Sequence, residues 1–282
     1  MVFLHYDQAE LDRQYDQRAW APNAAAIIQG YHDNSEHVRA RLGEPEVFAY
    51  GESPAETLDV YAAKSSGAPL HVFIHGGAWR LLGKRDSAFA AEAFVNAGAH
   101  FVALDFALAP QAALGTMVAQ VRSAVAWLYR HAHRFGGDRE RIFVSGHSSG
   151  AHLAACAAVT RWAERYGLPA GVMKGALCAS GSYELEPVRL SARNEYLRLD
   201  PEAVEAFSPL RHLADLGCPL IVAVGEHETD EFRRQAREFA AAAGVPLVEG
   251  KGLNHFEISE TLADPRGLLG RLALRQMSLP VS

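Results

Sequence analysis

Short apolar segments, separated by stretches of helical periodicity, place the strongest constraint on how this chain can fold. We expect strands at 46–50, 57–62, 70–75, 100–106, 141–146, 175–180, 219–225 and 245–250. The later segments, such as PLIVAVG, are almost continuously apolar rather than alternating. That pattern is typical of parallel strands that are covered on both faces.

Amphipathic helices are predicted between these strands. In 114–128 apolar residues recur at spacings of three and four, and 231–243 carries a second such stripe. Asp230 is a candidate N-cap and Gly244 a candidate C-cap of the latter helix. Strands that alternate with helices of this length predict an α/β fold, with a mostly parallel central sheet and helices on both faces.

Two segments interrupt the alternation. Residues 7–41 have a helical pattern ahead of the first strand, and 181–210 form a long excursion after the strand at 175–180. Excursions of this length at a strand end are usually functional. We therefore expect a single domain over 1–282 with a small helical cap, built from about 7–41 and 181–210. The aromatic candidates for lining a pocket beneath it are Tyr15, Trp20, Tyr31, Tyr183 and Tyr196.

Composition excludes several classes of protein. The 282 residues carry a formal net charge of −6, and lysine and arginine form no block. We therefore expect neither a nucleic-acid nor a membrane partner. No window approaches the length of an apolar membrane span. The three cysteines, Cys156, Cys178 and Cys218, are isolated and are expected to be free buried thiols, which favours a cytoplasmic protein.

A G-x-S-x-G pattern, Gly146-His147-Ser148-Ser149-Gly150, follows directly on one predicted strand and opens a helix. A serine on such a sharp turn has a strained backbone and needs small neighbours, and the turn lifts its hydroxyl clear of the sheet. We therefore expect Ser148 to be a nucleophile. Ser149 is expected to contribute its backbone N–H, with its side chain incidental. Ser145 and His152 are expected to make only structural hydrogen bonds.

A nucleophilic serine needs a base, and the base needs an acid to orient it. His255 follows the last predicted strand and is the expected base. The preceding strand is followed by EHETDEF, which offers Glu226, Glu228 and Asp230 at the edge of the sheet where α/β sites gather. We favour Glu228 as the acid, and the other two remain alternatives.

The segment FIHGGAWR (73–80) contains a His-Gly-Gly turn straight after a strand. Backbone N–H groups in such a turn stabilise the oxyanion that forms during acyl transfer. We expect Gly76, Gly77 and Ser149 to form this oxyanion hole. His75 is expected to brace the turn. Trp79 and His147 are candidate residues of the substrate pocket.

These motifs together resemble a known group of enzymes. HGGAW, DFALAP and GHSSGAHL look like the α/β-hydrolases related to hormone-sensitive lipase. SGSYELEPV, NEYLRLD, FSPL, GEHETDEFRRQ and LDRQYDQRA resemble the arylformamidase (kynurenine formamidase) branch of that fold. The resemblance implies a triad of Ser148, Glu228 and His255 and hydrolysis of an aryl formamide or a related small amide or ester.

The chain departs from the branch that it resembles at two informative positions. Glu228 stands where the branch usually has aspartate, which leaves the identity of the acid open. Ala78 stands where it usually has a large aromatic residue, which predicts a reshaped pocket beside the oxyanion hole.

Three hypotheses follow for the function. The first is a serine hydrolase that cleaves a small, aromatic acyl substrate through an acyl-enzyme, and the alternative is a general carboxylesterase. The third is a catalytically inactive ligand receptor on the same fold. No metal is expected, because His131 and His133 are two apart on a helix and face different sides and no H-x-x-x-H motif is present. No other cofactor is expected either. A homodimer is compatible with this fold.

Overall fold

The computed structural model describes residues 1–281 and contains an eight-stranded sheet in the order β1-β2-β4-β3-β5-β6-β7-β8. The strands are β1 (Glu46–Ala49), β2 (Thr57–Tyr61), β3 (Ala68–Ile74), β4 (His100–Leu104), β5 (Gly137–His147), β6 (Met173–Ala179), β7 (Leu220–Gly225) and β8 (Leu247–Gly250). β2 is antiparallel to both of its neighbours, β1 and β4. β3 to β8 are parallel to one another. All eight expected strands are therefore present, and the predicted α/β fold is confirmed.

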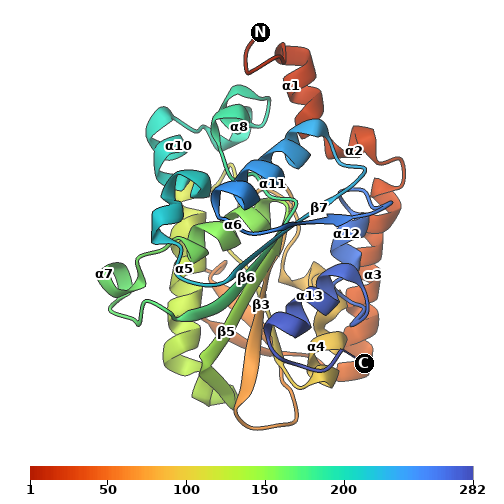
Figure 1. Ribbon diagram of the computed structural model, residues 1–282. Coiled ribbons are helices and arrows are strands. Elements are labelled where there is room, and N and C mark those ends of the chain that lie inside the picture. Colours follow the sequence, from red (N-terminus) through yellow and green to blue (C-terminus); the bar gives the residue numbers. More distant parts are fainter. Residues whose placement is uncertain (282) are drawn as a thin grey trace.

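Helices cover both faces of the sheet (Figure 1). The longer ones are α1 (Gln8–Tyr15), α3 (Ala24–Leu42), α4 (Ala91–Ala97), α5 (Leu114–His131), α6 (Ser149–Ala158), α10 (Pro201–Phe207), α11 (Asp230–Ala242) and α13 (Leu268–Gln276). The shorter ones are α2 (Gln17–Trp20), α7 (Trp162–Tyr166), α8 (Glu186–Leu190), α9 (Asn194–Leu197) and α12 (Glu257–Glu260), with 3-10 turns η1 (Lys84–Asp86), η2 (Ala88–Ala90), η3 (Ala132–Phe135) and η4 (Pro209–Asp215).

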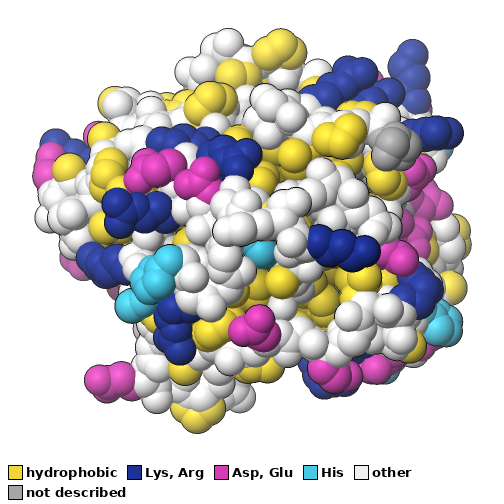
Figure 2. Space-filling view, turned by 90° about the horizontal axis from the view of Figure 1, so that it is seen from below, with side chains coloured by type: hydrophobic (Ala, Val, Ile, Leu, Met, Phe, Trp, Pro, Cys, Tyr) yellow, Lys and Arg dark blue, Asp and Glu magenta, His cyan; other side chains and the backbone are white. Residues whose placement is uncertain are grey.

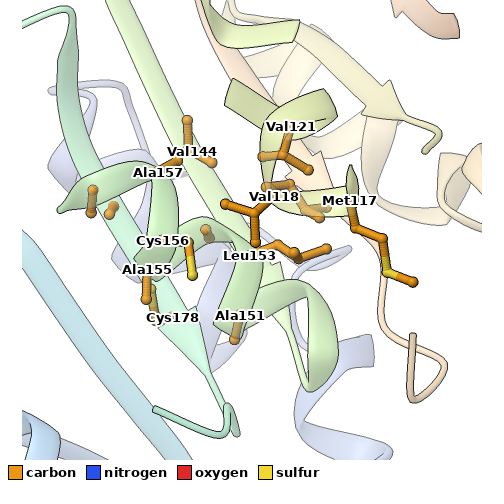
Figure 3. Close-up of a cluster of buried hydrophobic side chains, with 14 of the residues drawn as sticks. Met117, Val118, Val121, Val144, Ala151, Leu153, Ala155, Cys156, Ala157 and Cys178 are labelled. Atoms are coloured by element: carbon orange, nitrogen blue, oxygen red, sulfur yellow. The ribbon is translucent and has the colours of Figure 1, made fainter. Parts of the chain in front are cut away.

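Two hydrophobic clusters, one on each side of the sheet, form the core. α3, α4 and α13 contribute to one cluster, and α5, α6 and α11 contribute to the other. Figure 3 shows the second cluster, where Val118 and Val121 of α5 lie near Leu153 of α6. α6 is rich in alanine and fully buried, which brings its backbone close to β5 and β6. This packing anchors the helix that begins next to Ser148.

The segment 181–210 and the beginning of the segment 7–41, namely α1 and α2, lie at the end of the sheet where the parallel strands finish (Figure 1). The rest of 7–41 is α3, which runs along one face of the sheet and packs into the core there. The two cap segments contact each other, since the backbone N–H of Ala192 donates to Asp12 at 2.6 Å and the Arg193 guanidinium donates to the carbonyl of Tyr15 at 2.6 Å. α1 also packs against α8 and α11. Two segments that are far apart in sequence thus form one wall above the sheet.

One expected cap of a helix was wrong. Asp230 is the first residue inside α11, and Thr229 is the N-cap, with its hydroxyl accepting the N–H of Phe232 at 3.4 Å. The buried threonine is fixed by a second hydrogen bond, from Gln17, so it occupies the capping position and leaves Asp230 exposed. Gly244 has a φ of +68° just after α11, as its predicted role at the helix end requires.

The surface carries charges of both signs. Figure 2 views the molecule from its lower end in Figure 1, and there basic and acidic side chains are interspersed with hydrophobic ones. Within residues 1–281, no helix combines the length and apolarity that a bilayer crossing requires. Cys156 and Cys178 are buried free thiols as expected, whereas Cys218 is only half-buried.

Candidate active site

Ser148 lies at the junction between β5 and α6 with φ 56° and ψ −123°. This left-handed backbone is rare for a residue with a side chain. Glycines two residues to either side let the turn close: a Cβ at Gly146 would lie 2.2 Å from the carbonyl oxygen of Gly150, and one at Gly150 would lie 2.1 Å from that of Ile74. The G-x-S-x-G spacing is thus a steric requirement of this turn.

A chain of hydrogen bonds joins Ser148, His255 and Glu228. The Oγ of Ser148 lies 2.9 Å from Nε2 of His255, and Nδ1 of His255 lies 2.7 Å from Oε2 of Glu228. All three side chains are buried. With Glu228 ionised, Nδ1 carries the proton and Nε2 is free to accept the proton of the serine hydroxyl.

The structure separates the three acidic candidates. Glu228 alone contacts His255, and its Oε1 accepts hydrogen bonds from Ser180 Oγ at 2.5 Å and from the N–H of Gly225 at 2.7 Å. Glu226 instead accepts the N–H of Gly252 at 2.7 Å. Asp230 is exposed on the surface of α11.

The His-Gly-Gly turn passes beside Ser148. Gly77, Ala78 and Trp79 all have positive φ, at 103°, 54° and 60°. Within residues 1–281, the N–H groups of Gly77 and Ser149 have no acceptor of their own, which leaves them free to bind an oxyanion. Gly77 lines the cavity in front of Ser148, whereas Gly76 is packed against His147 and Ser148.

The side chain of Ser149 is not incidental, contrary to the expectation. Its Oγ accepts the backbone N–H of Trp79 at 3.1 Å and so ties the Gly77 turn to the start of α6. One hydroxyl therefore holds together the two elements that present N–H groups to the site, the Gly77 turn and the start of α6. No sequence pattern points to this contact, because the two residues are far apart along the chain.

Trp79 does not line the substrate pocket, which corrects a second expectation. Its side chain is almost fully buried, and its Nε1–H donates to Nδ1 of His152 at 3.3 Å. His152 in turn donates from Nε2 to the carbonyl of Phe207 at 2.8 Å. Burial lowers the pKa of His152 to about 4, so this histidine is a neutral structural group, as expected.

His147 reaches the site from the residue before the serine. Its Nε2–H donates to the carbonyl oxygen of His255 at 2.7 Å, and the two rings lie 4.8 Å apart. Burial holds the pKa of His147 well below its usual range, so the ring stays neutral. It lines the cavity, in agreement with the expectation, and it also supports the backbone of His255.

His75 braces the oxyanion turn, as expected. Its Nδ1–H donates to the carbonyl of Gly76 at 2.8 Å, and its ring stacks on Phe106 at a centroid distance of 4.5 Å. Burial lowers its pKa despite the proximity of Asp105.

A cavity of about 720 Å³ opens onto Ser148 and His255. Both cap segments contribute to its wall, and three of the five aromatic candidates line it: Tyr15, Tyr31 and Tyr196. Ala78 also lines it, so a larger side chain at that position would fill part of this space. Residues 1–281 contain no group of three or more His, Cys, Asp or Glu side chains placed to hold a metal ion.

A serine on a strand-to-helix turn of a mostly parallel sheet, with this order of serine, acid and histidine along the chain, defines the α/β-hydrolase class. A family model described as BD-FAE matches residues 58–176. A protein from Silicibacter sp. TM1040, provisionally described as a thioesterase, has a TM-score of 0.84 at 25% identity and covers 94% of this chain and 98% of that chain. An esterase from Pyrobaculum calidifontis has a TM-score of 0.71 at 21% identity, covering 93% and 97%.

The kynurenine formamidase of Danio rerio is 34% identical to this chain over 287 residues, which is 95% of this chain and 96% of that protein. The chain therefore belongs to the kynurenine formamidase family of α/β-hydrolases, and it is a hydrolase. The resemblance inferred from the motifs is confirmed by this similarity along almost the whole chain.

Sequence reasoning missed two polar residues at the site. Ser180 follows β6 and donates to Glu228, and Arg193 lies in the cavity wall. Ser180 occupies the carboxyl end of a predicted strand, where α/β sites gather, and that position was the only available signal. Arg193 carries no signal, since nothing local distinguishes it from a surface arginine.

Proposed function

We propose that this protein is a serine hydrolase that cleaves small aryl formamides, or closely related amides and esters, through an acyl-enzyme. The observation that carries the proposal is the continuous hydrogen-bond chain from Glu228 through His255 to Ser148, both links being under 3 Å. Membership of the kynurenine formamidase family supports the acyl substrate class.

The reaction begins when Ser148 Oγ attacks the substrate carbonyl carbon and its proton passes to Nε2 of His255. Glu228 holds the ring in the required tautomer and stabilises the imidazolium that forms. The N–H groups of Gly77 and Ser149 bind the oxyanion of the tetrahedral intermediate.

Collapse of this intermediate breaks the bond between the carbonyl carbon and the leaving-group nitrogen or oxygen, which takes the proton from His255. Water then attacks the acyl-enzyme, and His255 accepts a proton from that water. The second tetrahedral intermediate releases the acid and returns the proton to Ser148. No group beyond these side chains and water is needed to balance the steps.

A fluorophosphonate probe tests the nucleophile. We expect a single adduct on Ser148 in the wild type and none in Ser148→Ala, while Ser145→Ala still reacts. A folded wild-type protein without an adduct on Ser148 would refute the serine mechanism.

One observation favours the alternative function, a general carboxylesterase. Ala78 lines the cavity at a position where the family usually has a large aromatic residue. Turnover of N-formylkynurenine and of p-nitrophenyl acetate should be compared on the same preparation. We expect the formamide to be the better substrate. A large preference for the ester would assign the protein as a carboxylesterase instead.

A further inference from the structure

Arg193 is a half-buried cation in the wall of the active-site cavity. Among residues 1–281, no carboxylate lies within ion-pair distance of its guanidinium, and its Nη1 is buried without a hydrogen-bond partner. Burial lowers its pKa from the ordinary value, which reports the cost of holding this charge away from water. A guanidinium in such a place is stabilised when an anion supplies the missing partner.

The guanidinium is held in a fixed position. Its Nη2 donates to the carbonyl of Tyr15 at 2.6 Å, and its carbon lies 5.2 Å from the ring centre of Tyr15, 5.8 Å from that of Phe232 and 5.9 Å from that of Trp79. Contact with aromatic rings suits the flat face of a guanidinium, whose N–H donors point outwards in its plane. This preorganisation reduces the entropy lost when a carboxylate binds.

Arg193 lies close to the reacting groups. Phe232 contacts both Arg193 and His255, whose ring centre lies 4.9 Å from that of Phe232. Arg193, Ser148 and His255 also line the same cavity. A small ligand with its carbonyl at Ser148 therefore extends along a wall that includes this cation.

The other charged residues of the cavity are placed differently. Arg18 and Arg80 are exposed, and Arg80 lies over the ring of Tyr196 at 4.5 Å. The acids Asp16 and Glu195 are exposed too, and Asp12 already accepts from Gln8 and Ala192. The remaining acid, Asp86, is half-buried and lies 3.3 Å from Nδ1 of His32. Arg193 is thus the half-buried cation of the cavity wall, and it has no acidic partner.

We propose that Arg193 binds a carboxylate carried by the aromatic substrate, which makes it a specificity-determining residue of this hydrolase. A carboxylate suits the planar fork of arginine, which forms two parallel hydrogen bonds with it. The aromatic lining from Tyr15, Tyr31 and Tyr196 suits the ring that carries this group. The inference rests on the proposed function only for the orientation of the substrate, with its carbonyl at Ser148.

Binding to Ser148→Ala protein tests the inference without turnover. The ligands are formanilide and its 2-, 3- and 4-carboxy derivatives, measured by calorimetry in the Ser148→Ala background with Arg193, Arg193→Lys or Arg193→Gln. Arg198→Gln, on the exposed end of α9, removes one positive charge from the same segment and is the matched control. Parallel fluorophosphonate labelling of the protein with Ser148 intact tests the proposed function separately.

We expect at least one carboxylated isomer to bind about tenfold or more tightly than formanilide, as a charged hydrogen bond to arginine implies. Arg193→Gln should remove this preference while the Kd of formanilide stays within about twofold, and Arg193→Lys should retain part of it. Arg198→Gln should keep the preference.

Equal binding of all four ligands to the Arg193 protein would overturn the inference. So would a loss in Arg193→Gln that affects formanilide as much as the carboxylated isomer, because that result assigns Arg193 a purely structural role. Failure of Ser148 to react with the fluorophosphonate, with the preference for a carboxylate intact, would refute the proposed function and leave the binding role of Arg193 standing.

Discussion

The hydroxyl of Ser180 donates a hydrogen bond of 2.5 Å to Oε1 of Glu228. With the N–H of Gly225 on the same oxygen at 2.7 Å, it fixes the carboxylate so that Oε2 faces Nδ1 of His255. Ser180 is fully buried and has a φ of +58°, so the chain adopts an uncommon conformation at the residue that orients the acid.

Ser180→Ala is expected to lower kcat by about five- to twentyfold with KM nearly unchanged, because one hydrogen bond that positions the acid is lost. The pH dependence of kcat should shift as well, since the environment of the Glu228 and His255 pair changes. Ser182→Ala, at a buried serine two residues further on, is the control and should leave both unchanged. An unaltered pH profile in Ser180→Ala would contradict the positioning role.

Glu228→Gln is expected to lower kcat by about 10³-fold or more, because an amide neither fixes the tautomer of His255 nor stabilises its charged form. Glu226→Gln and Asp230→Asn should retain activity within about threefold, since the first contacts only a backbone N–H and the second is exposed. Steady-state kinetics of the three variants decides the identity of the acid. Greater loss in Asp230→Asn would transfer the role to that residue.

Ser149→Ala should reduce kcat by about tenfold while the protein remains folded. The variant loses the acceptor for the N–H of Trp79, so the turn that carries Gly77 is no longer tied to α6. The rate of acyl-enzyme formation, measured by stopped flow, reports this loosening. Unchanged acylation would show that the turn keeps its geometry without the hydroxyl.

Gly150→Ala is expected to destabilise the protein by roughly 2–4 kcal/mol, because the new Cβ would lie 2.1 Å from the carbonyl oxygen of Ile74. The matched control is Gly30→Ala within α3, where the nearest atom lies 3.7 Å from the new Cβ. That change should stabilise the helix by about 0.5–1 kcal/mol. Urea unfolding of both variants measures the change in the free energy of unfolding, which should be negative for Gly150→Ala and positive for Gly30→Ala. Equal changes in the two variants would contradict the steric explanation of the G-x-S-x-G motif.

Acid should destabilise the protein below pH 6.5. Burial lowers the pKa of His71 to about 3 and that of His152 to about 4, so both stay neutral in the folded protein at pH 5. In the unfolded chain they titrate near 6.5 and bind protons, so stability is lost as the pH falls from about 6.5 towards 4. The loss at pH 5 amounts to about 2 kcal/mol for each of the two.

Urea unfolding at pH 7 and pH 5 measures this dependence. His152→Gln should show a shallower loss, because one proton fewer is taken up on unfolding. His37→Gln, at an exposed histidine, should keep the wild-type dependence. The same pH dependence in wild type and His152→Gln would show that this histidine does not contribute.

The strands, the class of the fold and two of the three residues of the hydrogen-bonded triad could be predicted from the amino-acid sequence alone. Burial on both faces imposes continuous apolar strands, so PLIVAVG could be recognised as β7 without its partners. Gly146 and Gly77 are required by contacts within four residues, with Gly150 and Leu81, whereas Gly150 is required by its contact with Ile74 at the end of β3. Requirements that arise between residues close together in the sequence can be recognised from the sequence alone.

The acidic partner of His255, the N-cap of α11 and the lining of the cavity became clear only from the three-dimensional arrangement of the chain. Glu226, Glu228 and Asp230 differ little in sequence, and the choice depends on which side chain the loop turns towards His255. Trp79 is turned inwards to His152, and Arg193 donates to the carbonyl of Tyr15, which lies 178 residues away in the sequence. These outcomes depend on contacts between distant segments, because packing and hydrogen bonding across the fold determine where each side chain points.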